Sequence, residues 1–337
     1  MNNEKEAPQN VEQTKNNKRI ITKKPKISHN EFKKKWGCTK ADFDNIDDTK
    51  YFIDDFIAET SLNVIYARAK TGKSLFMQNF IHSLLIKYQN KEFYYIDNDN
   101  SLKTAKKRKI IDELEHLNFS YINKKKIYTY KGRVKELLDE IAELENLENC
   151  VIVFDSLRNF TNGADINKDK DLEKLMDKFE LLRINGACVF LLHHTKKGDS
   201  SEFRGGNGII ESADNVFYLR NLIKESKQQE KYKNELYYIA ELKDSRDDDE
   251  TQKAFYVNME TKEFKEVEIN EALKIVLPEI CFKAYELLKE QGDMNITKLY
   301  EALNIKSNAL QRNKIFMGNH ILYEIIGERE KICQVIP

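Results

Sequence analysis

Short apolar runs alternate with amphipathic stretches between residues 62 and 242. The apolar runs predict strands at Leu62–Tyr66, Phe93–Ile96, Val151–Phe154, Ala187–Leu192, Val216–Leu219 and Leu236–Leu242. Helical spacing of apolar residues predicts helices over Ser74–Tyr88, Val134–Glu145 and Leu172–Ile184. Strands that are buried on both faces read as continuous apolar runs, and helices between them supply the crossovers. The pattern therefore predicts an α/β core with a mostly parallel sheet flanked by helices.

The N-terminal part of the chain has a different character. Residues 1–28 are polar, rich in Lys and Asn, and lack hydrophobic periodicity, which predicts a disordered tail. Aromatic residues between Phe32 and Phe56 then predict a small packed element that leads into the core. We expect the core domain, with this element, to cover residues 29–270. Within it, the polar stretch Lys224–Asn234 predicts an exposed loop or hairpin tip.

A separate domain is expected over residues 278–337, beginning at Pro278. The pattern predicts helices at Ile280–Leu288, Ile296–Leu303 and Asn308–Phe316, followed by apolar runs at Ile321–Ile326 and Ile332–Ile336. Three helices followed by two short strands resemble a winged helix-turn-helix. The region carries equal numbers of acidic and basic residues. Contact with duplex DNA, and docking of a protein partner or another subunit, therefore both stay open.

Composition narrows the class of protein. The chain has 337 residues, 40% hydrophobic and 33% charged, as expected of one large core with smaller appendages or of two domains. No apolar run is long enough to cross a membrane and no secretion signal precedes the core, so we expect a cytoplasmic protein with no membrane partner. Five scattered cysteines without C-x-x-C spacing predict neither a disulfide framework nor a zinc site. The formal net charge is zero, so any surface for nucleic acid must be local.

The clearest chemical signal follows the first strand of the core. The segment reads Ala67-Arg68-Ala69-Lys70-Thr71-Gly72-Lys73-Ser74, a phosphate-binding loop of the G-x-x-x-x-G-K-S kind with alanine in the first position. Gly72 lets backbone N–H groups close around the phosphates, Lys73 supplies a positive charge, and the Ser74 hydroxyl is a ligand for Mg²⁺. The helix that begins there points its positive end at the anion. We expect residues 67–75, including Leu75, to bind ATP.

Two acidic segments follow later strands. Asp155 ends the apolar strand Val151–Phe154 and is predicted to hold Mg²⁺ together with Ser74. Asp97 and Asp99 follow the strand Phe93–Ile96, where a carboxylate lies over the site of an α/β sheet. Asp99 is predicted to activate the attacking water, with Asp97 as the other candidate. The same segment also suits an Asx turn that caps the next helix.

Histidines and basic residues end the remaining strands. His193 and His194 follow Ala187–Leu192, and alternation sends them to opposite faces, so only one can face the nucleotide. We select His193 as the residue that senses the γ-phosphate. The loop after it contains Lys196, Lys197 and Arg204, which suit either nucleic-acid phosphates or the ATP of a neighbouring subunit. Arg246, after the strand Leu236–Leu242, is a second candidate contact to the nucleotide.

Together these motifs resemble the RecA-like P-loop ATPases, and most closely the RepA-type hexameric helicases of plasmids, phages and other mobile elements. The likeness covers about residues 50–260. It depends on Tyr66–Leu75, Tyr95–Ser101, Phe154-Asp155-Ser156-Leu157-Arg158, Leu192-His193-His194-Thr195-Lys196-Lys197 and Phe203-Arg204-Gly205. The resemblance implies a γ-phosphate sensor at the histidine pair and makes Arg204 an arginine finger supplied to a neighbour. Asp99 stands where the family commonly has Glu, and Ala67 where it has Gly.

The expected function is a DNA-stimulated ATPase, a hexameric ring that moves on or unwinds single-stranded DNA during replication of a mobile element or phage. Two alternatives stay open: an ATP-switched DNA-binding regulator without unwinding activity, and a RecA-like recombination or repair ATPase. The sequence does not distinguish DNA from RNA or set a direction of movement. It also leaves the biological pathway and the role of the C-terminal region open.

Overall fold

The computed structural model describes residues 27–44, 48–129, 134–161, 169–195, 203, 208–226, 228–246, 251–306, 310, 321–326 and 330–335. The chain divides into two compact units, Met1–Asp48 and Thr49–Pro337. Most of the tail predicted over residues 1–28 lies outside the described residues. In the part of the chain that the structure describes, no helix has the length and apolar character needed to cross a membrane.

The first unit contains two short helices, α1 (His29–Trp36) and α2 (Lys40–Asp44). A capping box begins α1, because the Ser28 hydroxyl accepts from the Glu31 N–H and the Glu31 carboxylate accepts from the Ser28 N–H. Neither helix buries a residue, and Phe32 and Trp36 are more than half exposed. Of the aromatic residues in the expected lead-in element, Phe32, Trp36 and Phe43 are therefore exposed, whereas Phe52 and Phe56 are buried. Helices of one or two turns offer too little apolar surface to pack alone.

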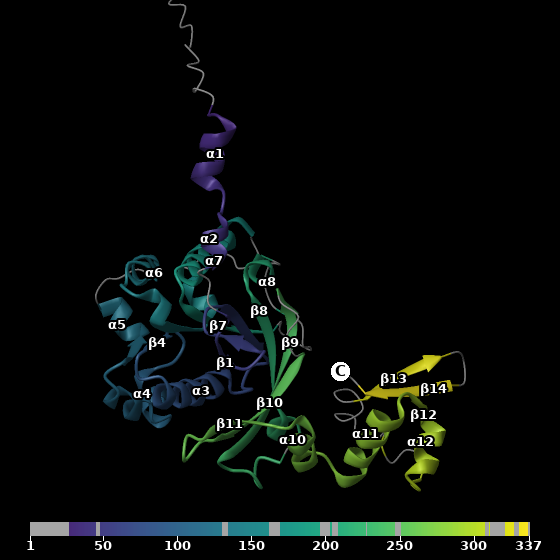
Figure 1. Cartoon of the computed structure of the whole chain (residues 1–337). Coiled ribbons are helices and arrows are strands. Elements are labelled where there is room, and N and C mark those ends of the chain that lie inside the picture. Colours follow the sequence, from purple (N-terminus) through teal and green to yellow (C-terminus); the bar gives the residue numbers. More distant parts are fainter. Residues whose placement is uncertain are drawn as a thin grey trace, which may run out of the picture. The chain divides into compact units, whose positions relative to one another are not determined.

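Within the described residues of the second unit, nine strands form one sheet in the order β11-β10-β9-β8-β3-β7-β6-β4-β5 (Figure 1). Six are parallel: β3 (Leu62–Ala67), β4 (Glu92–Asp97), β5 (Phe119–Asn123), β6 (Cys150–Asp155), β7 (Cys188–His194) and β8 (Asn215–Asn221). Three run antiparallel: β9 (Glu235–Ser245), β10 (Gln252–Asn258) and β11 (Phe264–Val267). All six predicted strands are confirmed, and β5, β10 and β11 are additional.

Helices cover both faces of this sheet (Figure 1). On one face, Phe80 of α3 (Lys73–Lys87) packs edge-on against Phe190 of β7. On the other, Phe179 of α7 (Asp169–Ile184) packs against Phe154 of β6. The two hydrophobic clusters share no residue, as alternation along each central strand requires. The predicted α/β core with a mostly parallel sheet is confirmed.

Shorter elements connect the strands. They are β1 (Tyr51–Ile53), β2 (Ile57–Ala58), α4 (Leu102–Lys107), η1 (Ile110–Glu115), α5 (Lys124–Thr129), α6 (Val134–Ala142), η2 (Leu147–Asn149), η3 (Leu157–Phe160), α8 (Gly208–Ser212), α9 (Leu222–Glu225) and α10 (Ile269–Val276). The helices predicted at Ser74–Tyr88, Val134–Glu145 and Leu172–Ile184 correspond to α3, α6 and α7. The two strands β1 and β2 pair antiparallel in a separate small sheet, and Phe52 of β1 and Phe56, just before β2, join the main core.

The C-terminal region contains α11 (Glu279–Gln291), α12 (Ile296–Ala302) and a sheet in the order β12-β14-β13. Its strands are β12 (Met294–Asn295), β13 (Ile321–Ile326) and β14 (Glu330–Val335), all antiparallel. Two predicted helices and the strand pair are therefore present. The helix expected at Asn308–Phe316 lies outside the described residues except for Leu310, which is buried. The winged-helix interpretation and the boundary at residue 278 stay predictions.

Candidate nucleotide-binding site

A tight loop joins β3 to α3, as the sequence motif predicts. Lys70 and Gly72 both have positive φ, 67° and 102°, and Gly72 is the N-cap of α3. A Cβ atom at Gly72 would lie 2.7 Å from the Tyr238 hydroxyl oxygen. Glycine is therefore required for two separate reasons, the left-handed backbone and the close approach of Tyr238. The backbone N–H groups at the start of α3 are left free to bind an anion.

A cavity of about 600 Å³ opens over this loop. Its lining residues are Lys70, Gly72, Lys73, Ser74, Leu75, Asp99, Asn100, Thr104, Lys107, Arg108, Lys109, His194, Lys224 and Met259. Six Lys or Arg side chains and a single carboxylate, that of Asp99, are among these described residues. A strongly cationic cavity above a helix N-terminus fits a polyphosphate.

Lys73 lies at the floor of the cavity. Its side chain is 6% exposed, and Nζ lies 3.1 Å from Nδ1 of His194 at the end of β7. Burial lowers the pKa of Lys73 to about 8, although the charges of Asp155 and Asp99 oppose that shift. The cation is therefore poorly solvated until an anion reaches it, which favours phosphate binding.

Asp155 lies beside Ser74, the pair predicted to hold Mg²⁺. It is 1% exposed, its Oδ2 accepts from the Tyr95 hydroxyl at 2.9 Å, and it is hydrogen-bonded to the Ser74 side chain. Burial raises the pKa of Asp155 to about 6, and repulsion from Asp97 adds to the rise. A buried carboxylate held beside a hydroxyl is an oxygen donor set that suits a hard divalent cation.

Asp97 and Asp99 have different roles in the structure. Asp97 is completely buried, and it accepts from the backbone N–H groups of Asp99 and Asn100 and from the Tyr121 hydroxyl. It forms the Asx turn that the sequence suggested. Asp99 is exposed, lines the cavity and accepts from Nδ2 of Asn159 at 3.2 Å. Of the two carboxylates, only that of Asp99 is open to a bound ligand.

Residues 38–200 match the family model of an AAA domain. This stretch contains the phosphate-binding loop, Asp99, Asp155 and His194. This part of the chain is therefore similar to an AAA domain, and it has the P-loop and the mostly parallel sheet of a RecA-like fold.

Many solved structures resemble the chain, and three of them are compared with it. One is an ATPase domain that is 15% identical and matches over 62% of this chain and 86% of that chain, with a TM-score of 0.47. The KaiC-like protein PH0186 from Pyrococcus horikoshii is 13% identical over 66% of this chain and 98% of that chain, with a TM-score of 0.46. The flagellar accessory protein FlaH from Methanocaldococcus jannaschii is 18% identical over 62% and 90%, with a TM-score of 0.41. No curated protein matches the sequence.

The P-loop is held in place by side chains that the sequence analysis did not select. Nδ2 of Asn221 donates to the Thr71 carbonyl at 3.0 Å, and Nζ of Lys224 donates to the Lys70 carbonyl. Tyr238 of β9 adds a weak hydrogen bond to the Gly72 carbonyl. The strand pair β8–β9 therefore holds the loop from outside the matched family region. No local motif identifies these residues, because their role depends on the tertiary pairing of β3 with β8.

His194, and not the predicted His193, reaches the cavity. His193 is 1% exposed and its ring packs against Phe203, with the ring centroids 4.9 Å apart. Phe190 and Leu192 belong to the hydrophobic cluster that contains α3, so alternation along β7 places His194 on the same face. The sequence limited the choice to one histidine of the pair, but it did not show which face of β7 the P-loop helix covers.

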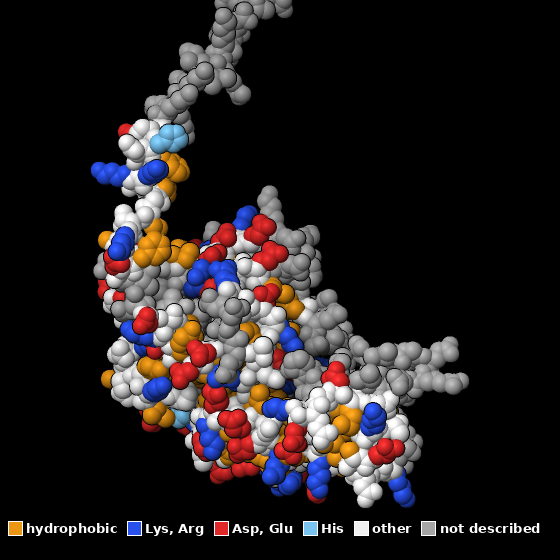
Figure 2. Space-filling view, turned by 45° about the vertical axis from the view of Figure 1, so that its right-hand side comes forward, with side chains coloured by type: hydrophobic (Ala, Val, Ile, Leu, Met, Phe, Trp, Pro, Cys, Tyr) orange, Lys and Arg blue, Asp and Glu red, His pale blue; other side chains and the backbone are white. Residues whose placement is uncertain are grey.

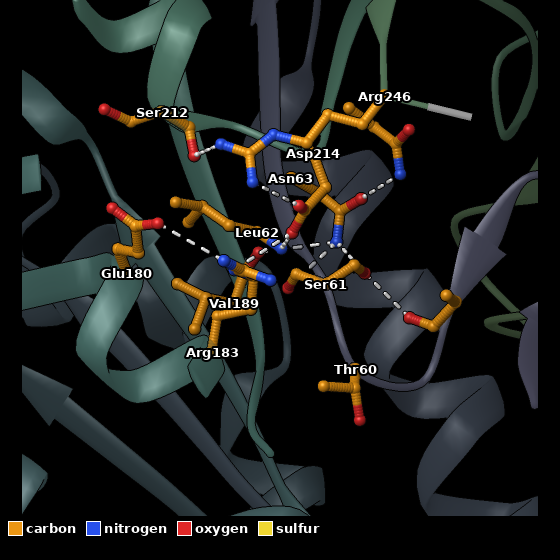
Figure 3. A network of polar contacts seen from close by, with 12 residues as sticks. Thr60, Ser61, Leu62, Asn63, Glu180, Arg183, Val189, Ser212, Asp214 and Arg246 are labelled. Carbon is orange, nitrogen blue, oxygen red and sulfur yellow. Dashed lines mark hydrogen bonds and ion pairs between the residues drawn. The ribbon is translucent and has the colours of Figure 1, made fainter. Parts of the chain in front are cut away.

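Arg246 lies at the opposite edge of the sheet from the P-loop, in the polar network of Figure 3. Its guanidinium contacts Asp214 at 3.3 Å and donates to the carbonyls of Glu211 and Ser212. Asp214 in turn accepts from the backbone N–H of Leu62, the first residue of β3. The proposed contact between Arg246 and the nucleotide of the same chain is therefore wrong. Because β9 is antiparallel to β8, its last residues lie beside the start of β8, level with the start of β3.

The other predicted nucleotide ligands divide into two groups. One group, which lines the cavity, consists of Lys70, Gly72, Lys73, Ser74 and Leu75. The remaining loop residues, Ala67, Arg68, Ala69 and Thr71, do not line it. Arg204, Lys196 and Lys197 lie outside the described residues.

On the face drawn in Figure 2, acidic and basic side chains are interspersed, as the zero net charge leads one to expect.

Proposed function

We propose that this chain hydrolyses ATP with Mg²⁺ in the cavity above the P-loop. The strongest support is that four side chains come together around the P-loop, each from the end of a different strand. They are Lys73, Asp99, Asp155 and His194. In this proposal Lys73 binds the transferred phosphate and Asp99 accepts a proton from the attacking water. His194 contacts Lys73 and so responds to the phosphate it binds.

Ser74 and Asp155 would hold the Mg²⁺ ion. Their hydrogen bond shows that the hydroxyl and the carboxylate already lie within reach of each other. When bound, the cation neutralises charge on the phosphates. Tyr95 orients Asp155 through the 2.9 Å hydrogen bond, so the carboxylate is fixed before the cation arrives. Asp97, saturated by hydrogen bonds, keeps the Asp99 segment in position.

We further propose that hydrolysis is coupled to single-stranded DNA in a hexameric ring, as a helicase or translocase that replicates a mobile element or phage. Support comes from the resemblance of the histidine pair and Phe203-Arg204-Gly205 to RepA-type helicases. It also comes from position, because the basic segment with Lys196 and Lys197 directly follows His194 and Thr195. Arg204 is the proposed finger that completes the site of a neighbouring copy.

The test is the rate of ATP hydrolysis with and without single-stranded DNA, together with the mass of the assembly in ATP. A hexamer whose turnover rises with single-stranded DNA, and which displaces a paired strand, supports the proposal. Tight binding of duplex DNA without displacement favours the ATP-switched regulator, and growing filaments favour the recombination ATPase. Lys73→Ala is the matched inactive control, since loss of its charge should remove hydrolysis in all three cases.

The shared site is tested by mixing two inactive variants. Arg204→Ala should bind ATP and assemble but hydrolyse it about 10³ to 10⁵ times more slowly. Mixing it with Lys73→Ala should restore part of the activity, because some interfaces then combine an intact loop with an intact finger. A mixture as inactive as its components, in assemblies shown to contain both chains, contradicts a finger supplied by the neighbour.

A further inference from the structure

Three metal-binding side chains converge on the far end of α3 from the P-loop. His82 lies on α3, Glu113 on η1, and His116 directly after η1. Their ligand atoms all lie within 4.8 Å of one another, the single group of this kind among the residues that the structure describes. Nδ1 of His82 lies 2.6 Å from Oε2 of Glu113, and the centroids of the two imidazole rings are 6.4 Å apart.

The local backbone explains why Glu113 and His116 lie together. Residues three apart in a 3₁₀ helix are nearly eclipsed, so the Glu-x-x-His sequence places both side chains on one face. His82 supplies the third group from a separate helix. Glu113 is 5% exposed, while His82 and His116 are partly exposed, so an ion can reach the imidazoles from solvent.

The geometry is close to that of a tetrahedral metal. Two donors each about 2.05 Å from a tetrahedral zinc ion lie about 3.4 Å apart. The contact between His82 and Glu113 must lengthen by about 0.8 Å, and the widest pair, at up to 4.8 Å, must close by roughly 1.4 Å. Both changes are of a size that rotation of the partly exposed imidazole side chains can supply.

The surroundings of Glu113 keep its carboxylate ionised. Nζ of Lys262 lies 2.6 Å from Oε1 of Glu113 and occupies that oxygen, which leaves Oε2 for one further bond. Burial raises the pKa of Glu113, but hydrogen bonds from His82 and Lys262 outweigh it and hold the pKa below its usual value. Gln78, one turn before His82 on the same helix face, is 7% exposed, and neither of its side-chain polar atoms has a partner in the described structure.

We propose that His82, Glu113 and His116 form a binding site for Zn²⁺, with two imidazoles, one carboxylate oxygen and a fourth position for water. Two nitrogen donors favour zinc and its neighbours in the first transition row over Mg²⁺, which prefers oxygen donors. The site is separate from the Mg²⁺ position of the P-loop, and cysteine spacing does not reveal it because no cysteine takes part.

This site joins α3, whose first residues line the cavity above the P-loop, to η1, which directly follows residues that line it. It fixes η1 to α3, and the residues just before η1 are Lys107, Arg108 and Lys109, which line the cavity. Lys262 strengthens the link by donating to the Lys109 carbonyl at 3.1 Å. Bound Zn²⁺ would hold these three cations in place. This regulatory role relies on the proposed ATPase function, whereas Zn²⁺ binding itself does not.

The experiment uses the full chain, stripped with a chelator and free of nucleotide and Mg²⁺. Titration with Zn²⁺ by calorimetry, and with Co²⁺ by visible absorption, measures affinity, number of ions and geometry. We expect one ion per chain and the intense absorption of tetrahedral cobalt. His116→Ala should weaken binding by about 100-fold or more, since even the loss of a supporting contact to a ligand costs about 10- to 100-fold.

His116→Ala is the decisive variant, because it leaves the contact of His82 with Glu113 and Lys262 intact. His29→Ala on α1 is the matched control and should bind as the unchanged chain does. Zn²⁺ should also raise the melting temperature of the unchanged chain but not of His116→Ala. The proposal is overturned if His116→Ala binds as tightly as the unchanged chain, if no ion binds, or if binding is lost only in His194→Ala. A change in ATP turnover with Zn²⁺ is measured separately, so failure of the ATPase proposal is not confused with failure of the site.

Discussion

Nζ of Lys73 lies 3.1 Å from Nδ1 of His194, which brings the lysine of the P-loop into contact with the last residue of β7. The lysine is buried, and its pKa of about 8 means that it is only partly charged in weakly alkaline solution. An incoming phosphate favours the charged form and so raises that pKa.

Binding of ATP should therefore take up protons at a pH above about 8, the pKa of Lys73. At about pH 8.5, calorimetric heats measured in two buffers of different ionisation enthalpy should differ, because the buffer supplies a proton to Lys73. Lys73→Arg should show no such difference if it binds, since arginine stays protonated. Equal heats in both buffers for the unchanged chain would contradict the lowered pKa.

Replacement of the two histidines should give different defects. His194→Ala removes the contact with Lys73 and should lower turnover by about 10- to 100-fold, the usual range for a hydrogen bond to a charged group. His193→Ala leaves a gap beside Phe203 and should mainly lower the free energy of unfolding. Turnover at saturating ATP and urea unfolding distinguish them. The assignment fails if His193→Ala stops turnover at full stability.

Replacement of the two aspartates in the turn after β4 should also give different defects. Asp99→Asn should keep stability and ATP binding but lose turnover, because the amide cannot accept a proton. Asp97→Asn exchanges an oxygen acceptor for a donor in a buried turn and should destabilise the fold by about 1 to 3 kcal/mol. Single-turnover kinetics and urea unfolding test both. Full turnover in Asp99→Asn would show that a group other than Asp99 is the general base.

Asp155 should make the empty domain less stable. Its folded-state pKa is raised from 3.8 to about 6, so the folded state binds the proton more tightly than the unfolded chain does. Ionised Asp155 therefore lowers the free energy of unfolding. This destabilisation is absent at pH values below 3.8, grows as the pH rises to about 6, and is fully present above it. Asp155→Asn should therefore be more stable at about pH 8 by up to about 3 kcal/mol while losing turnover. Urea unfolding at pH 8 and pH 5 measures the difference, which should shrink at the lower pH. If the two chains differed in free energy of unfolding by the same amount at both pH values, ionisation of Asp155 would not be what destabilises the fold.

Much of the fold was predictable from local pattern. Apolar runs located β3, β4, β6, β7, β8 and β9, because strands buried in a parallel sheet leave a strong signal. The sequence Gly72-Lys73-Ser74 located the phosphate loop, because that loop is built from consecutive residues. The strand β5, with Ser120 and Asn123 among its five residues, lies at the sheet edge and lacks a continuous apolar run.

Features that depend on strand direction were not predictable. Arg246 was expected at the nucleotide because it ends a strand, but β9 runs antiparallel and delivers it to the opposite edge. His194 rather than His193 faces the cavity because α3 covers one particular face of β7. Lys224 and Tyr238 reach the loop only through the pairing of β3, β8 and β9. Each of these contacts joins residues far apart in the chain, and no local pattern records such a relationship.

Thr195, directly after β7, pairs antiparallel with Phe203. Thr195 directly follows His194, and Phe203 returns to the same strand end, where its ring packs on His193 and Tyr66. Both points at which the intervening segment is attached are thus tied to the strand whose last residue contacts Lys73. A displacement that begins at the nucleotide would reach the two attachment points together.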